Sequence, residues 1–85
     1  MRMKQVTTHQ DFIRDIQKAT GCQGYISWNK IAAYRGVSKN NNIERERLTI
    51  GCKYIEDGRG RRYRVIDIAA RMKELEQIEI ERYES

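Results

Sequence analysis

The sequence contains no proline, and it has only one histidine, His9, and two cysteines, Cys22 and Cys52. Without proline, no residue breaks a helix by removing a backbone donor. One histidine and two isolated cysteines are too few for a structural zinc site, which takes four such ligands. We interpret the cysteines as small apolar residues in a reducing compartment, and we predict neither a metal nor a cofactor.

Long apolar stretches are also missing. No run approaches the roughly 18 residues of a membrane span, and the opening MRMKQVTTHQ lacks the apolar middle of a secretion signal. We therefore expect an intracellular protein, in the cytoplasm and associated with the nucleoid in a bacterial host. No histidine is placed to activate a cysteine or serine, and no carboxylates form a metal-binding set, so we predict no enzyme.

Positive charge is abundant and unevenly distributed. Seventeen basic residues oppose 12 acidic ones, for a net charge of +5. Residues 30–64 hold ten basic and four acidic residues, a net of +6, whereas residues 65–85 hold three basic and six acidic residues, a net of −3. This distribution favours a polyanionic partner for the middle of the chain and keeps the acidic end away from it.

The length of 85 residues predicts a single domain with one modest core. We expect residues 1–7 to be flexible and residues 76–85 to form an acidic helical tail. A first helix is expected between a Thr8 cap and Gly21. Its apolar face has helical spacing and consists of Phe12, Ile13, Ile16 and Ala19.

A helix-turn-helix is predicted next. After a short extended piece at residues 25–26, a helix is expected over about 28–35, followed by a tight turn. In IAAYRGVSKN, residues 31–40, an alanine lets two helices approach and a glycine four residues later permits that turn. Ser38 or Asn41 is placed to cap a third helix over about 42–50. We expect that helix to bury Ile43, Leu48 and Ile50.

A β-hairpin is expected after the third helix, with strands at residues 52–55 and 62–65 around the turn EDGRGR. Asp57-Gly58 is a hairpin signal, because both positions of such a turn require positive φ. Alternation in RRYRV directs Tyr63 and Val65 to one face and the intervening arginines to the other.

A final helix follows the hairpin. Asp67 is placed to cap it, and the helix is expected to run for about 16 residues. Its apolar positions have helical spacing and are Ile68, Met72, Leu75 and Ile78.

The candidate DNA-binding residues fall into two groups. Asparagine and arginine have the donors and acceptors to read adenine and guanine edges in the major groove, although asparagine also favours turns and caps. The candidates on the third helix and the turn before it are Lys39, Asn40, Asn41, Asn42, Arg45 and Arg47. The hairpin adds candidates for contact with phosphate or the minor groove, namely Arg59, Arg61, Arg62 and Arg64.

Two segments, ISWNKIAAYRGVS and RRYRVIDI, resemble excisionase-like and MerR-like winged helix-turn-helix domains of phages and mobile elements. In these domains an apolar residue, a capping Ser or Thr, an alanine and Gly-Val-Ser occur in this order. A basic-aromatic-basic strand then leads into an Asp-capped helix. The resemblance covers about residues 26–72. It implies a mainly α fold with a small β-hairpin: three helices, an arginine-rich wing and a C-terminal helix.

The resemblance also implies a function. Such a domain binds specific double-stranded DNA, with the third helix in the major groove and the wing beside it. It acts either as an excisionase-like recombination directionality factor, partnered by an integrase or another DNA-bound protein, or as a small transcriptional regulator. The alternative is a non-catalytic interaction or assembly module, such as a phage packaging or structural component. In that alternative the acidic C-terminal helix would be the working surface. In either case the end of this helix is expected to be a solvated tail or a homodimer contact.

Overall fold

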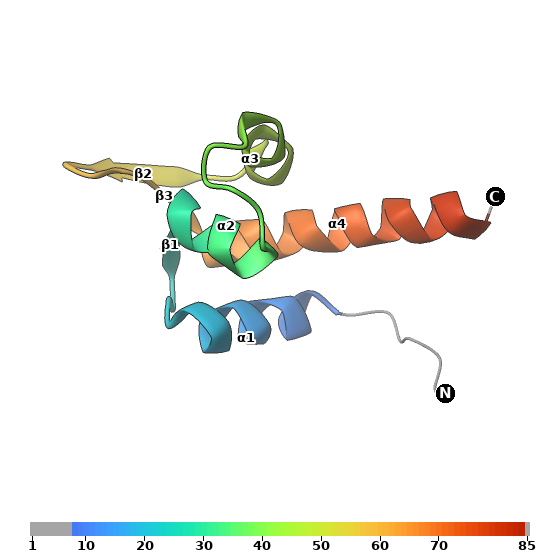
Figure 1. Cartoon of the computed structure of the whole chain (residues 1–85). Coiled ribbons are helices and arrows are strands. Elements are labelled where there is room, and N and C mark those ends of the chain that lie inside the picture. Colours follow the sequence, from blue (N-terminus) through green and yellow to red (C-terminus); the bar gives the residue numbers. More distant parts are fainter. Residues whose placement is uncertain (1–7, 85) are drawn as a thin grey trace.

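A computed structural model describes residues 8–84, with side chains over 8–79 and at 81, and this part of the chain forms four helices and three strands (Figure 1). The elements are α1 (His9–Thr20), β1 (Tyr25–Ser27), α2 (Trp28–Arg35), α3 (Asn42–Thr49), β2 (Tyr54–Asp57), β3 (Gly60–Arg64) and α4 (Val65–Glu84). The predicted mainly helical class with a small hairpin is confirmed. The prediction for residues 1–7 lies outside the described residues.

The three strands form one antiparallel sheet in the order β1-β3-β2. The hairpin pairs β2 with β3, and the expected extended piece at residues 25–26 becomes β1 on the other edge of β3. Tyr63 stands opposite Ile26 on one side and Tyr54 on the other. The sheet therefore connects the segment that follows α1 to the hairpin and to the first turn of α4.

The start of α1 and the C-terminal ends of α1 and α2 lie at the residues that local sequence signals predict. Thr8 and Asp11 form a reciprocal capping box at α1, with N···O distances of 3.1 and 3.2 Å. Hydrogen bonds to the carboxylate, from the Thr8 side chain first and then from the Thr8 N–H, lower the pKa of Asp11. Gly21 and Gly36 end α1 and α2 in the left-handed region, at φ 75° and 73°, which glycine adopts without steric cost.

Helix α3 differs from expectation in which residues it buries. Asn41 rather than Ser38 is its cap, because the Asn41 side chain accepts the Glu44 N–H at 3.1 Å. Only Leu48 of the predicted apolar face is buried; Ile43 is 82% exposed and Ile50 is 60% exposed. Eight residues form about two turns, so the helix offers one residue to the core. The predicted burial of both isoleucines is wrong.

The hairpin register is also shifted from the prediction. Asp57 pairs with Gly60, so the turn consists of Gly58 and Arg59. Neither Asp57 nor Gly58 has a positive φ; instead the Asp57 carboxylate accepts the Arg59 N–H at 2.9 Å, and Gly60 takes φ 120°. The predicted turn conformation at Asp57-Gly58 is therefore wrong, although the hairpin itself forms.

Helix α4 begins before the predicted cap. It starts at Val65, so Asp67 lies inside its first turn, where the carboxylate accepts the Lys53 N–H at 3.0 Å. Asp67 thus ties the hairpin base to α4 and does not cap the helix. The alternation predicted around Val65 is confirmed, because Tyr63 and Val65 are buried.

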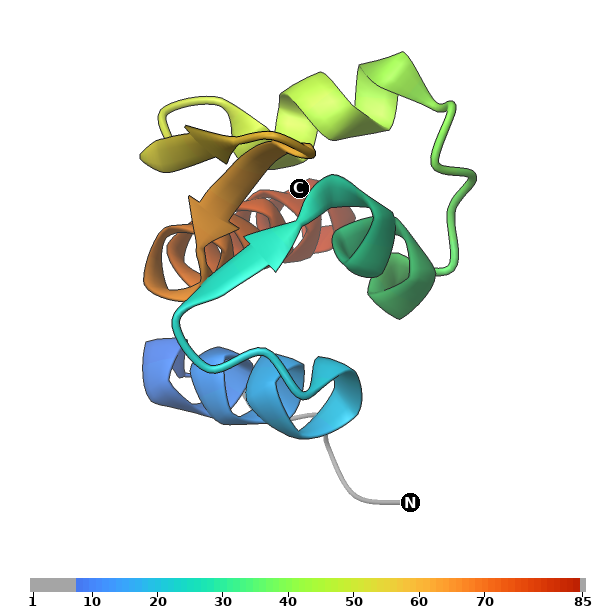
Figure 2. The same cartoon turned by 90° about the vertical axis from the view of Figure 1, so that its left-hand side faces the viewer.

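The core lies where α1, α2, α4 and the inner face of the sheet meet. Its buried residues are Ile16, Ile26, Trp28, Ile31, Ala32, Leu48, Tyr63, Val65, Ile68, Ala69, Met72 and Leu75. Phe12 and Ile13 pack against this cluster, but Ala19 is exposed, contrary to expectation. Figures 1 and 2 show α1 and α3 on opposite sides of α4, with the sheet across its first turn.

Candidate nucleic-acid interface

The β2–β3 hairpin extends from one end of the molecule as a ribbon (Figure 1). We call residues 53–64 the wing; they contain five basic and two acidic residues, a net of +3. Figures 1 and 2 show this ribbon beside α3, so the two predicted groups of DNA-binding residues lie on neighbouring elements.

The wing presents different arginines on its two faces. Paired residues of an antiparallel sheet share a face, and faces alternate along each strand. Ile26 and Tyr63 are buried on the inner face. Arg62 and Arg64 therefore lie on the outer face. Arg64 stands opposite Tyr25 on β1, which is 42% exposed.

Arg61 follows the inner face instead. Its guanidinium lies 4.4 Å from the centre of the Tyr54 ring, which meets the Tyr63 ring edge-on at a centroid distance of 5.9 Å. This cation–π contact holds Arg61 beside the ribbon. Arg59, at the turn, is exposed. The four wing arginines thus surround the hairpin and do not form one row.

Three of the wing arginines have carboxylate neighbours. Nε of Arg61 lies 3.7 Å from Glu56, Nε of Arg62 lies 3.1 Å from Asp57, and Nε of Arg64 lies 3.8 Å from Asp67. These arginine side chains are 40–46% exposed. Ion pairs this exposed contribute little to stability. A phosphate can therefore compete for these arginines at little cost to the fold.

The turn between α2 and α3 is anchored by a tryptophan. Trp28 is 5% exposed, and its indole Nε1 donates to the Lys39 carbonyl at 2.7 Å. The Ser38 hydroxyl accepts the Asn40 N–H at 3.1 Å. The side chains of Lys39 and Asn40 are exposed, so the turn offers one positive charge and one amide to a ligand from a fixed backbone.

The candidate residues on α3 do not share one face. Asn41 serves as the cap, whereas Asn42 is exposed at the first turn. At about 100° per residue, Arg45 and Arg47 lie on opposite flanks of Leu48. Arg45 is half-buried, and Arg47 pairs with Glu44 at 3.6 Å.

The outward face of α3 is apolar and acidic. Ile43, Glu46 and Ile50 lie about 140–160° around the helix from Leu48, and all three are exposed. Residues 42–49 carry two arginines and two glutamates, a net charge of zero. This helix therefore contributes no net positive charge to the basic surface.

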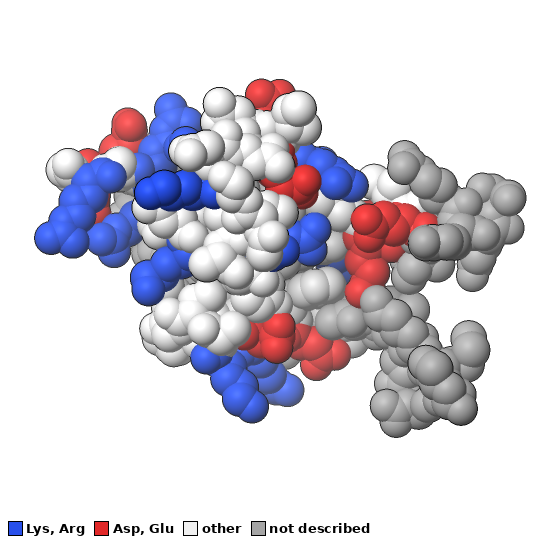
Figure 3. Space-filling model, viewed as in Figure 1, with Lys and Arg blue, Asp and Glu red and all other residues white. Residues whose placement is uncertain are grey.

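The space-filling view shows both signs of charge over this face, with basic side chains densest at the wing end (Figure 3). Lys and Arg side chains crowd the wing end, with acidic side chains at its tip, and other acidic side chains face the far half of α4 (Figure 3). Lys53 of the wing is exposed and was absent from the predicted set, as was Tyr25. Pairing of Tyr25 with Arg64 joins strands that are far apart in the sequence, so local patterns could not reveal it.

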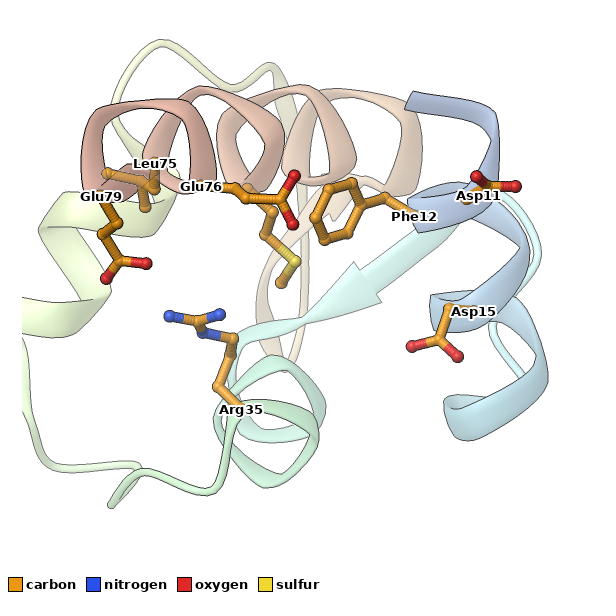
Figure 4. Close-up of a pocket in the computed structure, with 8 residues that line it drawn as sticks. Asp11, Phe12, Asp15, Arg35, Leu75, Glu76 and Glu79 are labelled. Atoms are coloured by element: carbon orange, nitrogen blue, oxygen red, sulfur yellow. The ribbon is translucent and has the colours of Figure 1, made fainter. Parts of the chain in front are cut away.

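A groove of about 520 Å³ between α1, α2 and α4 is acidic, in contrast to the basic wing. Four carboxylates, from Asp11, Asp15, Glu76 and Glu79, line it together with the side chain of Arg35. Figure 4 shows Arg35 reaching into the groove toward the side of α4 that carries the two glutamates. The acidic excess would repel a nucleic acid.

The Asp15 carboxylate in that groove accepts a hydrogen bond from the Tyr34 hydroxyl. Burial first, and then this hydrogen bond, raise the pKa of Tyr34 to about 12. Within residues 8–84, His, Cys, Asp and Glu form no cluster that could hold a metal ion. In the same part of the chain, no helix has the length and apolar character needed to span a bilayer.

Comparison of the chain with protein-family models, with curated proteins and with solved structures gives no match.

Proposed function

We propose that the protein binds double-stranded DNA without catalysis, through the wing and the turn between α2 and α3. The order helix-strand-helix-helix-strand-strand and the strand order β1-β3-β2 support a winged helix-turn-helix. A β-ribbon beside a helix-turn-helix is a geometry that suits duplex DNA. The observation that carries the proposal is the outer face of the wing, where the half-buried Arg62 and Arg64 side chains keep 44% and 40% of their surface exposed.

Phosphate contacts by the wing supply most of the affinity in this proposal. Arginine forms strong charge-assisted hydrogen bonds with phosphate, and each contact releases counterions from the duplex. The acidic half of α4 lies away from the wing (Figure 1), so it does not oppose the approach of a polyanion.

Base recognition in this proposal rests on fewer residues than the sequence predicts. Asn40 and Asn42 are exposed at the N-terminal end of α3 and have side-chain amides of the kind that read adenine. Arg45 is half-buried and Arg47 is paired with Glu44. We therefore expect modest sequence preference, which suits an excisionase-like architectural factor better than a highly selective regulator. An integrase or another DNA-bound protein stays the predicted partner.

Fluorescence anisotropy with a labelled duplex tests the proposal. Replacing Arg59, Arg61, Arg62 and Arg64 together by glutamine removes four charges and is expected to weaken binding by two orders of magnitude or more at low salt. Replacing Asn40 by alanine is expected to change the preference between sequences and to affect overall affinity less. Unchanged affinity in the fourfold variant would rule out the role of the wing.

A further inference from the structure

The outward face of α3 carries the most exposed large apolar side chain among the described residues. Ile43 is 82% exposed and Ile50 is 60% exposed. The two are seven residues apart, so they form one stripe on the helix. Neither is needed for the core, since Leu48 alone anchors α3. Two solvent-exposed isoleucines on one face of a short helix indicate an interaction surface for another molecule.

A groove runs along this stripe. Its volume is about 320 Å³, and its lining consists of Asn42, Ile43, Glu46, Arg47, Ile50 and Arg71. Arg71 belongs to α4 and is fixed in place, because its Nε donates to the Arg47 carbonyl at 2.7 Å. Its Nη1 lies 3.5 Å from Glu74. The groove therefore combines an apolar stripe with a basic margin formed by Arg47 and Arg71.

Duplex DNA does not suit this groove. Phosphates would meet Glu46 in the middle of the stripe, and base edges offer apolar contact only at the thymine methyl group. An acidic, amphipathic protein helix does suit it, since isoleucines would pack against the stripe and carboxylates would lie along the Arg47 and Arg71 margin. Arg47 is about 100° around α3 from Glu46.

This chain itself contains such a helix. The C-terminal half of α4 extends beyond the rest of the fold (Figure 1). Residues 74–84 hold five acidic residues and one basic residue, a net of −4. Ile78 is 45% exposed on this half. It follows Arg71 by seven residues and so lies on the same side of α4, about 10 Å farther along.

We propose that the outward face of α3 binds the C-terminal half of α4 of a second copy of this chain. Each copy carries both surfaces, so a closed two-fold dimer makes the contact twice. Ile78 of one copy packs against Ile43 and Ile50 of the other, and Glu81 faces the basic margin of the groove. The wing is outside this contact, and of the residues assigned to DNA only Asn42 and Arg47 also line the groove. The proposal therefore goes beyond DNA binding by the wing and does not depend on it.

Sedimentation equilibrium without DNA tests the inference on the full chain. The wild type is expected to reach twice the chain mass of 10.1 kDa between micromolar and millimolar concentration. Ile43→Asp and Ile78→Asp are each expected to raise the dimer dissociation constant at least about tenfold. The matched control is Ile66→Asp in the first turn of α4, outside both the groove and the wing. Ile66 is 41% exposed in the wild type, and the dimer dissociation constant of this variant is expected to stay unchanged. Circular dichroism verifies that each variant folds.

A charge exchange identifies the occupant. Arg47→Glu and Glu81→Arg each weaken the dimer, and a mixture of the two variants is expected to recover association, because the exchanged charges are again opposite. A wild-type chain that stays monomeric throughout overturns the inference, as does a dimer that ignores both isoleucine variants. Loss of DNA affinity in Ile43→Asp at unchanged mass would assign the face to DNA and also overturn it. Absence of DNA binding by the wild type affects only the proposed function.

Discussion

Replacing Arg62 and Arg64 by glutamine removes two positive charges from the outer face of the wing and leaves its shape intact. Their ion pairs with Asp57 and Asp67 are 40–44% exposed on the arginine side, so the cost to folding is at most about 1 kcal/mol for each pair. The variant should therefore fold, and its effect on DNA binding is electrostatic.

The magnitude follows from counterion release. Each phosphate contact contributes about −0.9 to the slope of log K against log salt, so losing two contacts makes the slope shallower by about 1.8. Between about 50 mM and about 200 mM salt, the ratio of wild-type to variant affinity is then expected to shrink about twelvefold. Anisotropy titrations at several salt concentrations measure both slopes.

The control carries the same change in charge on another element. Arg14→Gln with Lys18→Gln removes two exposed charges from α1, which lies on the side of α4 opposite to α3 (Figure 2). This variant is expected to keep the wild-type slope, since α1 makes no phosphate contact. Equal slopes for the wild type and the wing variant would refute the reasoning. Equal loss in both double variants would show that net charge, and not position, governs binding.

Three further results are expected. Asp57→Asn removes the carboxylate 3.1 Å from Arg62 but keeps the Oδ1 acceptor for the turn, so anisotropy should show several-fold tighter DNA binding at low salt. Burial, followed by the charge of Asp67, raises the pKa of Cys52 to about 11, so iodoacetamide at pH 8 should alkylate it about a hundredfold more slowly than an unstructured thiol; equal rates would contradict this. The pKa of Tyr34 in the folded state is about 12, above its ordinary value, so the stability that this shift adds is present below pH 10 and is lost between pH 10 and 12. In urea unfolding, the free energy of unfolding of the wild type should lose its advantage over Tyr34→Phe in that range.

Local signals in the sequence were sufficient for the ends of the first two helices. The Thr8 cap and the glycines at positions 21 and 36 act within a few residues, so their patterns identify them. Alternation in the hairpin also placed Tyr63 inside and its arginine neighbours outside. These features depend on backbone geometry that neighbouring residues determine.

Features that depend on distant residues could not be predicted in the same way. The burial of Leu48 and the exposure of Ile43 and Ile50 depend on how α3 sits on α4, which an apolar pattern does not contain. β1 pairs with β3 although about 36 residues separate them. Asp67 resembles a helix cap in the sequence, but its carboxylate is used by the hairpin base at Lys53.

In the candidate site, too, the local features could be predicted from the sequence and those that depend on distant residues could not. The concentration of arginine at residues 59–64 is visible in the sequence, and all four side chains lie on the wing. Their distribution between two faces and their carboxylate neighbours follow from the register, in which Glu56 stands opposite Arg61. The run of asparagines was ambiguous in the sequence, because asparagine favours both helix caps and contacts with bases. The hydrogen bond from the Glu44 N–H to the Asn41 side chain makes Asn41 the cap.

The central claim is that a nucleic acid contacts the wing and the turn before α3. Amide chemical shifts of the isotope-labelled chain, recorded while a short duplex is added, test this claim most directly. The account predicts shifts concentrated at residues 38–42 and 53–64, with α1 and the acidic groove unchanged. Shifts concentrated on α1, or no shifts at a duplex concentration that saturates the anisotropy signal, would contradict it.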